Sequence, residues 1–368
     1  MAKRITAAAA AALLCAALLL AVLAPRARAV TFTAVNNELL ELTADTQPEY
    51  VDGKLYVPGS VFANTSLGVV MASARQQIFL YKDGNSLTFS VADETTKDQA
   101  GNYYSNIKPV YRYGRIYVPV DFVCVYFGFS YSYISAPVAP IVRIKSGAVL
   151  DDAVFADAAT PSMRNRLSRY ESSLATPTPS VEPTPTPTPE IPYYGDVSVF
   201  IAIRGMDEEH TPAMLDRLAR AEMRACFFLT AEEMDSSPDI LRRIAVEGHT
   251  VGLLSRGEDD AAAWRAASDS LLRHAVTRSL LAACCDGGGE AAAEEGLRLC
   301  FDGSFPVCSD ESGYGFNDAM ASMLSAENAV SVLIETDDEA ETTLERLLEF
   351  IRVARFDVRV LRETSKLG

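Results

Sequence analysis

The chain has 368 residues, of which 49% are hydrophobic, so it is long and apolar enough for two domains that each bury a core. Its formal net charge of −16 argues against nucleic acid and anionic membrane surfaces as partners, because both repel a strongly acidic protein.

The first 29 residues predict a secretory signal peptide. Lys3 and Arg4 precede an Ala- and Leu-rich run over residues 5–24, and small residues flank Arg28 in the cleavage motif that ends at Ala29. We expect cleavage after Ala29 and a secreted or envelope-associated protein. An uncleaved membrane anchor is the alternative. We expect no transmembrane segment after cleavage, because no later run is long and apolar enough.

Residues 30–150 predict a first domain of the α+β class with an internal duplication. The motif Gly-Lys-Leu-Tyr-Val-Pro at 53–58 recurs as Gly-Arg-Ile-Tyr-Val-Pro at 114–119. A short apolar segment, a glycine and an alternating strand-like run follow each copy, as at 77–81 and 141–144. This pattern predicts two related strand–helix–strand units.

These repeated motifs resemble the copper amine oxidase N-terminal-like domain, also called a stalk domain, over residues 33–147. The resemblance implies the stalk fold without redox chemistry, because copper and amine oxidation belong to a separate catalytic domain of that family. Residues 30–209 contain no histidine, so composition excludes a histidine copper site in this domain.

Tyrosine is concentrated in the second half of this domain, with eight residues between 103 and 133. Aromatic residues are favoured in strands, where they pair across the sheet. The alternative is a stacking surface for the rings of a cell-wall glycan, which the amphipathic tyrosine face suits. The candidate binding residues are Tyr103, Tyr104, Tyr111 and Tyr113.

Residues 151–192 predict a connection between domains. Residues 151–174 have helical spacing and either close the first domain or lead out from it. Thr-Pro dipeptides then repeat over 176–192, and proline removes the backbone donors that helices and sheets need. We expect an extended, semi-rigid spacer.

Residues 193–368 predict a second domain of the α/β class, because short apolar strands alternate with amphipathic helices. We expect a strand at 197–203, a helix that opens at Thr211, a strand at 225–230 and a helix near 238–244. A Gly-His-Thr-Val-Gly turn follows at 248–252. The last unit reads as a strand at 331–334, a helix at 341–352 and a closing strand at 356–361.

This order resembles the polysaccharide deacetylase family, the NodB-like carbohydrate esterases, over residues 193–368. The resemblance implies a distorted (β/α) barrel with any site at the carboxyl ends of its strands. In that family the first strand ends in Thr-Phe-Asp-Asp-Gly, the Gly-His turn leads to two metal-binding histidines, and a late Leu-His-Asp motif supplies an acid. The corresponding positions here hold Ile203, Arg204, Leu254, Glu258 and Glu335.

Deacetylation of an N-acetyl sugar needs a metal-activated water, a carboxylate base and an acid for the leaving amine. Isoleucine and leucine cannot bind a metal, and arginine repels one. The resemblance therefore implies a retained scaffold without its reactive centre, for which we expect no catalytic residues and no cofactor. We expect a cell-envelope protein that binds or scaffolds a cell-wall glycan.

Two other functions stay open. One is a divergent metal-dependent deacetylase, a hydrolase of carbon–nitrogen bonds in acetylated carbohydrate, with a divalent metal on relocated acidic loops. Its candidate ligands are Asp207, Glu209, His210 and Glu258. The other is a purely structural surface spacer.

Six cysteines remain after removal of the signal peptide. Cys124 and Cys226 lie in apolar runs and are expected to be buried. An even count in an exported chain permits disulfides. The one pairing left open joins Cys284 or Cys285 to Cys300 or Cys308.

Overall fold

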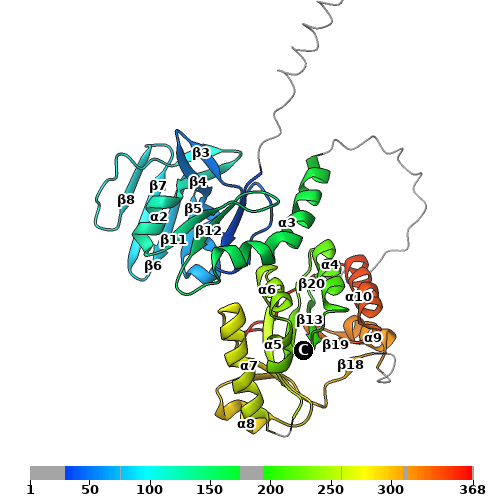
Figure 1. Cartoon of the computed structure of the whole chain (residues 1–368). Coiled ribbons are helices and arrows are strands. Elements are labelled where there is room, and N and C mark those ends of the chain that lie inside the picture. Colours follow the sequence, from blue (N-terminus) through cyan, green and yellow to red (C-terminus); the bar gives the residue numbers. More distant parts are fainter. Residues whose placement is uncertain (1–29, 75, 175–193, 258, 310–313, 367–368) are drawn as a thin grey trace, which may run out of the picture.

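The computed structural model describes residues 30–174 and 194–366, apart from residue 75, residue 258 and residues 310–313. The expected signal peptide and the Thr-Pro spacer lie outside these residues, and the domain boundaries stay predictions. Within the described part, no helix has the length and apolar character that crossing a membrane requires. A β-rich domain is followed by a domain built on one large sheet (Figure 1).

Three four-stranded sheets form the first domain. The first sheet contains β11 (Ser130–Ile134), β12 (Ile141–Lys145), β1 (Phe32–Val35) and β2 (Glu38–Leu39). The second contains β3 (Glu49–Val51), β4 (Lys54–Pro58), β10 (Arg115–Pro119) and β9 (Val110–Arg112). The third contains β5 (Val70–Ala74), β6 (Gln77–Lys82), β7 (Asn85–Ser90) and β8 (Thr95–Asp98).

The duplication is visible in the second sheet. The repeated motifs form β4 and β10, which are antiparallel neighbours with Val57 opposite Val118. Each motif is preceded by a hairpin partner, β3 or β9, and the turn glycines Gly53 and Gly114 share a φ of +78°. That left-handed conformation favours glycine.

A helical segment and a second hairpin complete each unit. The first unit continues through 3₁₀ turns η1 (Gly59–Ala63) and η2 (Thr65–Leu67) to β5 and β6. The second continues through α2 (Val120–Phe127) to β11 and β12. The repeat is therefore longer than the expected strand–helix–strand unit, because a hairpin flanks the helical segment on each side.

Helix α3 (Asp152–Leu174) joins the two domains. Its residues Phe155, Ala159 and Met163 are buried with Phe32 of β1, and Val246 of the second domain belongs to the same apolar cluster. Figure 1 shows the helix bending along its length. Pro161 lies inside this helix, and proline cannot donate the backbone hydrogen bond of its position. The helix both closes the first domain and packs on the second.

The second domain contains an eight-stranded sheet whose described pairs are all parallel. Along the sheet lie β17 (Arg298–Phe301), β16 (Leu281–Cys284), β15 (Thr250–Ser255), β14 (Cys226–Leu229), β13 (Ser198–Arg204), β19 (Ala329–Glu335) and β18 (Val307–Cys308). The eighth strand, β20 (Asp357–Val358), pairs with β13 and is shorter than the expected strand at 356–361.

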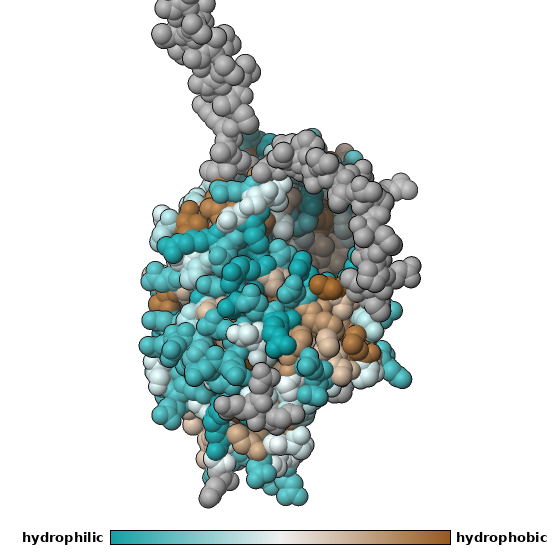
Figure 2. Space-filling view, turned by 90° about the vertical axis from the view of Figure 1, so that its right-hand side faces the viewer, coloured by the Kyte–Doolittle hydropathy of each residue, from teal (hydrophilic) through white to brown (hydrophobic). Residues whose placement is uncertain are grey.

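Seven helices accompany this sheet in the described residues. They are α4 (Thr211–Ala221), α5 (Ala231–Ser236), α6 (Pro238–Val246), α7 (Asp260–Ala275), α8 (Gly289–Glu294), α9 (Phe316–Ser325) and α10 (Ala340–Ala354). The expected helix starts near 211 and 238 are confirmed. Figure 2 shows the face seen from the right of Figure 1, which is covered mainly by hydrophilic residues.

Alternating residues of each strand divide the second domain into two apolar layers. Val199, Ile201 and Ile203 face the helices, whereas Phe200 and Ala202 face the inside of the curled sheet. The sheet thus curls around its own apolar filling, which makes it the expected distorted (β/α) barrel. Among the described residues, no pairing joins β17 to β18, so the barrel is open there.

A close approach inside the barrel requires a glycine in β15. A Cβ atom at Gly252 would lie 2.4 Å from the ring of Phe228. That ring in turn meets Phe301 edge-on, with 5.3 Å between the centroids. The interior is therefore packed with side chains, and a ligand can enter only at the ends of the strands.

Candidate functional site

The carboxyl ends of the parallel strands meet on one rim of the barrel, here called the mouth. Arg204 ends β13 and Glu335 ends β19, and the two residues lie directly opposite each other in the strand register. Arg204 Nε donates a hydrogen bond to Glu335 Oε2. Two of the positions singled out in the sequence are thus brought into contact as an ion pair.

A second arginine completes this cluster. Arg256, the residue that follows β15, donates from Nη2 to Glu335 Oε1 over 2.7 Å. The same nitrogen lies 3.7 Å from Glu233 Oε1. Burial would lower the pKa of Arg256, but the hydrogen bond and charge of Glu335 and the charge of Glu233 raise it. Both carboxylates of the mouth cluster (Arg204, Glu335, Arg256 and Glu233) therefore face permanent cations.

The backbone around the mouth cluster fixes its geometry. Glu233 forms a capping box with Thr230 at the start of α5, so its other carboxylate oxygen accepts the Thr230 amide over 2.8 Å. Thr336 Oγ1 donates to the carbonyl of Gly205 over 2.9 Å. Gly205 has a φ of +92°, and the Arg256 guanidinium lies 3.0 Å from the place of a Cβ there.

The remaining positions of the deacetylase-like pattern do not reach the mouth cluster. Ile203 is buried between the sheet and the helices, and Leu254 is buried inside the barrel. Glu258 lies outside the described residues. A divalent metal needs several donor atoms that are free to bind it. The described positions offer instead two apolar side chains, one cation and one carboxylate that two guanidiniums already bind. The residues present do not fit the metal that the family pattern implies.

Of the candidate ligands for a relocated metal that the structure describes, Asp207 and His210 lie in contact. Asp207 Oδ2 lies 2.9 Å from His210 Nδ1, and Asp207 Oδ1 accepts the His210 amide over 2.7 Å, so the pair holds the start of α4. The hydrogen bond that the His210 ring donates to the Asp207 carboxylate raises the pKa of His210. Glu209 is exposed. In the part of the chain that the structure describes, no group of three or more His, Cys, Asp or Glu residues could hold a metal ion.

The four candidate tyrosines do not share one environment. Tyr104 packs edge-on against Phe122 and its hydroxyl donates to Asp98 over 3.0 Å. Tyr103, Tyr111 and Tyr113 are exposed, in the bridge beside β8, in β9 and in the turn after it. Their role in glycan binding stays a prediction.

The open disulfide prediction is wrong in this structure. Cys284 and Cys285 both have free thiols, although Cys284 is buried and Cys285 is exposed. Their candidate partners Cys300 and Cys308 also have free thiols. Cys124 and Cys226 are buried as expected, and burial raises the pKa of both thiols.

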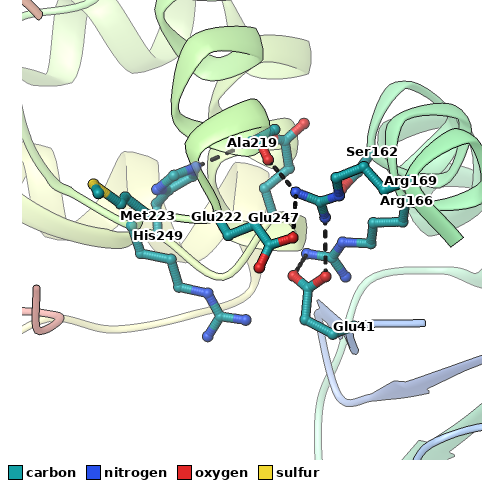
Figure 3. A pocket seen from close by; sticks show the side chains of 10 residues that line it. Glu41, Ser162, Arg166, Arg169, Ala219, Glu222, Met223, Glu247 and His249 are labelled. Carbon is teal, nitrogen blue, oxygen red and sulfur yellow. Dashed lines mark hydrogen bonds and ion pairs between the residues drawn. The ribbon is translucent and has the colours of Figure 1, made fainter. Parts of the chain in front are cut away.

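A second polar cluster lies at the opposite end of the barrel, where α3 packs on the second domain (Figure 3). Arg166 is buried, donates to the carbonyl of Leu39 over 2.5 Å and forms an ion pair with Glu41 over 3.1 Å. Arg169 also pairs with Glu41 and donates to the carbonyl of Ala219 at the end of α4. These contacts tie the first domain to the base of the barrel.

Two buried residues of the second domain line the same base. Glu247 pairs with Arg243 over 2.7 Å, and its other oxygen lies 3.7 Å from His249 Nε2, too far for a hydrogen bond. His249 Nδ1 accepts the amide of Ala225 over 3.1 Å, which places this histidine in a structural role. Burial lowers the pKa of His249 despite the opposing effect of Glu247.

Sequence reasoning missed Arg256 and Glu233 at the mouth. The sequence next to each residue contains a feature that could have indicated it. Arg256 directly follows an apolar strand, and Glu233 completes a Thr-x-x-Glu capping box. Nothing in the sequence alone shows that these two loops meet Glu335, which lies 79 positions beyond Arg256 along the chain.

Comparisons with known proteins match both parts of the chain. Residues 197–267 match the family described as "Polysaccharide deacetylase", and residues 34–137 match "Copper amine oxidase N-terminal domain". A peptidoglycan-N-acetylglucosamine deacetylase of Bacillus cereus is 46% identical over 48 residues. That match covers 13% of this chain and 18% of the relative, so the chain spans less than a fifth of the relative's length.

Two solved structures are similar to part of this chain. The peptidoglycan deacetylase PdaC from Bacillus subtilis is 13% identical with a TM-score of 0.39, over 45% of this chain and 87% of that one. The catalytic domain of a peptidoglycan N-acetylglucosamine deacetylase from Eubacterium rectale is 12% identical with a TM-score of 0.40, over 50% of this chain and 96% of that one.

Proposed function

Because the chain joins a copper amine oxidase N-terminal domain to a polysaccharide deacetylase domain, we propose that it is an exported cell-envelope protein whose deacetylase-like barrel binds or scaffolds cell-wall glycan without catalysis. The observation that carries this proposal is the mouth cluster, in which Arg204 and Arg256 both bind Glu335.

The argument against catalysis rests on the donor set. Metal-assisted deacetylation needs ligands for the ion and a carboxylate free to take a proton from water. Glu335 faces two guanidiniums, which occupy both of its oxygens. Ile203 and Leu254 offer no donor atom and are turned into the two apolar layers. Arg204 brings a positive charge to the place where a cation would have to bind.

The argument for a glycan partner rests on the matched family and the relative. The Bacillus cereus protein is named for N-acetylglucosamine in peptidoglycan, and the second domain here keeps the barrel, with Arg256 at the mouth 40% exposed. The net charge of −16 disfavours polyanionic partners and leaves neutral or cationic polymers. Export is supported by the sequence of the first 29 residues.

Co-sedimentation with purified peptidoglycan sacculi tests the proposal. The two-domain chain, residues 30–368, is expected to pellet with sacculi, whereas an unrelated protein of similar size and negative charge stays in the supernatant. Recovery of the whole chain in the supernatant would overturn the binding function and favour the surface-spacer alternative.

A divergent deacetylase is the competing function, and the contact between Asp207 and His210 is the observation that favours it. It requires a bound divalent metal, with Glu209 and Glu258 as further ligands. This alternative predicts that the chain releases acetate from an acetylated chito-oligosaccharide once it is supplied with metal. The glycan-binding proposal predicts retention on sacculi without acetate release.

A further inference from the structure

Three exposed tyrosines of the first domain gather at one surface, the three-tyrosine surface (Tyr50, Tyr131 and Tyr133). Their exposed fractions are 59%, 38% and 48%. The rings of Tyr50 and Tyr133 meet edge-on, with 6.4 Å between the centroids and 63° between the planes. Single exposed aromatic residues need no explanation, but a contiguous group marks a candidate binding surface.

The fold brings these side chains together from two sheets. Tyr50 lies in β3 at the edge of the second sheet, and Tyr131 and Tyr133 lie in β11 at the edge of the first. Because Tyr131 and Tyr133 are two positions apart in one strand, they point to the same side. Helix α2 packs on β11 and on β4, the neighbour of β3, which places it beside the group (Figure 1).

A carboxylate lies on the helix that packs against β11. Asp121 is in the first turn of α2. Burial raises the pKa of the Tyr131 hydroxyl, and the negative charge of Asp121 raises it further. Val125, one helical turn further along, is 80% exposed. The surface therefore combines aromatic faces with negative charge, on a chain whose net charge is −16.

We propose that Tyr50, Tyr131, Tyr133 and Asp121 form a binding surface for a glycan that carries protonated amines, such as a glucosamine polymer. Tyrosine faces offer stacking area to sugar rings, and their π-systems attract cations. A carboxylate forms charge-assisted hydrogen bonds with an ammonium group. An acetylated sugar keeps the ring but loses the positive charge, so this surface discriminates between the two.

This inference rests on the proposed function in one respect: it takes the class of ligand, a cell-wall glycan, from it. The binding site itself lies in the first domain and not in the barrel. Calorimetric titration of residues 30–368 with glucosamine hexamer and with N-acetylglucosamine hexamer tests it. The glucosamine hexamer is expected to bind about tenfold more tightly, because cation–π and charge-assisted contacts add to ring stacking. Equal affinity for the two hexamers, or tighter binding of the acetylated one, would overturn the proposal.

Substitutions locate the site. Tyr50→Ala and Tyr133→Ala, both at exposed positions, are each expected to weaken binding of the glucosamine hexamer by about fivefold to tenfold. Asp121→Asn is expected to reduce the preference for the glucosamine hexamer over the acetylated one. The matched control is Tyr81→Ala, an exposed tyrosine in β6 of the third sheet, which is expected to leave affinity unchanged.

Far-ultraviolet circular dichroism of each variant separates loss of binding from loss of folding. An unchanged affinity in folded Tyr50→Ala and Tyr133→Ala, or an equal loss in Tyr81→Ala, contradicts the assignment. If the chain pellets with sacculi but does not prefer the glucosamine hexamer, this inference fails and the proposed function stands. If it prefers that hexamer but does not pellet with sacculi, the proposed function fails and the site stands.

Discussion

The two ends of the barrel carry the same kinds of side chain in different surroundings. At the mouth, Arg204, Glu335 and Arg256 form ion pairs that solvent reaches, since the Arg256 side chain is 40% exposed. At the base, Arg166 of α3 and Glu247 of the second domain are almost wholly buried. Exposed pairs contribute little to stability, whereas removing one partner of a buried pair leaves an uncompensated charge. The comparison indicates that the base holds the domains together, while the mouth cluster contributes little to stability.

Loss of the buried arginine should have the largest effect. Arg166→Ala removes the donor to the Leu39 carbonyl and one partner of Glu41, and we expect the free energy of unfolding to fall by about 3 kcal/mol. Urea unfolding of the two-domain chain measures this. Arg164→Ala on the exposed side of the same helix is the control and should change little. Equal losses of unfolding free energy in Arg166→Ala and Arg164→Ala would contradict the claim that the buried base of the barrel holds the domains together.

The histidines at the two ends of the barrel should make stability depend on pH in opposite directions. Burial lowers the pKa of His249 at the base, so its contribution to stability is full above the unfolded pKa of about 6.5 and is lost as pH falls through its folded pKa. The bond to Asp207 raises the pKa of His210 near the mouth, so its contribution is full below about 6.5 and is lost as pH rises through its folded pKa.

Thermal unfolding of two variants between about pH 5.5 and pH 8 separates these contributions. His249→Gln should reduce the loss of melting temperature on acidification, and His210→Gln should reduce the loss at the alkaline end. The same change of slope in both variants would show that the two environments do not differ in the way described.

The smallest effect is expected at the mouth. Glu335→Gln removes the charge that Arg204 and Arg256 share, and we expect a loss of unfolding free energy of about 1 kcal/mol or less because water screens the pairs. Glu247→Gln at the base is the matched comparison and should cost more, since its partner Arg243 is largely buried. A larger loss for Glu335→Gln would assign the mouth cluster a structural role that we do not give it.

The sequence predicted the fold well where periodic patterns carry it. The repeated Tyr-Val-Pro motifs predicted the duplication, and their strands are neighbours in one sheet. The alternation of apolar strands and amphipathic helices predicted the α/β class, and the family resemblance implied the barrel. The extra hairpins of each repeat were missed, because β3 and β9 are only three residues long and leave almost no alternation to detect.

The candidate sites were predicted less completely. The positions of Arg204 and Glu335 were identified through the family pattern, but their ion pair depends on the register between β13 and β19. Arg166 was missed because helical spacing marks an apolar face without showing which surface covers it. Tyr50 was missed because it lies far along the chain from the tyrosine-rich stretch, and only the folded chain brings it to Tyr133.

The central claim is that the barrel mouth no longer holds a metal centre. The most direct test supplies purified residues 30–368 with zinc, cobalt or nickel, then measures bound metal and the acetate released from an acetylated chito-oligosaccharide. The Bacillus cereus deacetylase serves as the positive control. We predict neither stoichiometric metal nor acetate from this chain. One bound metal per chain together with acetate release would contradict the account and establish a rebuilt active site.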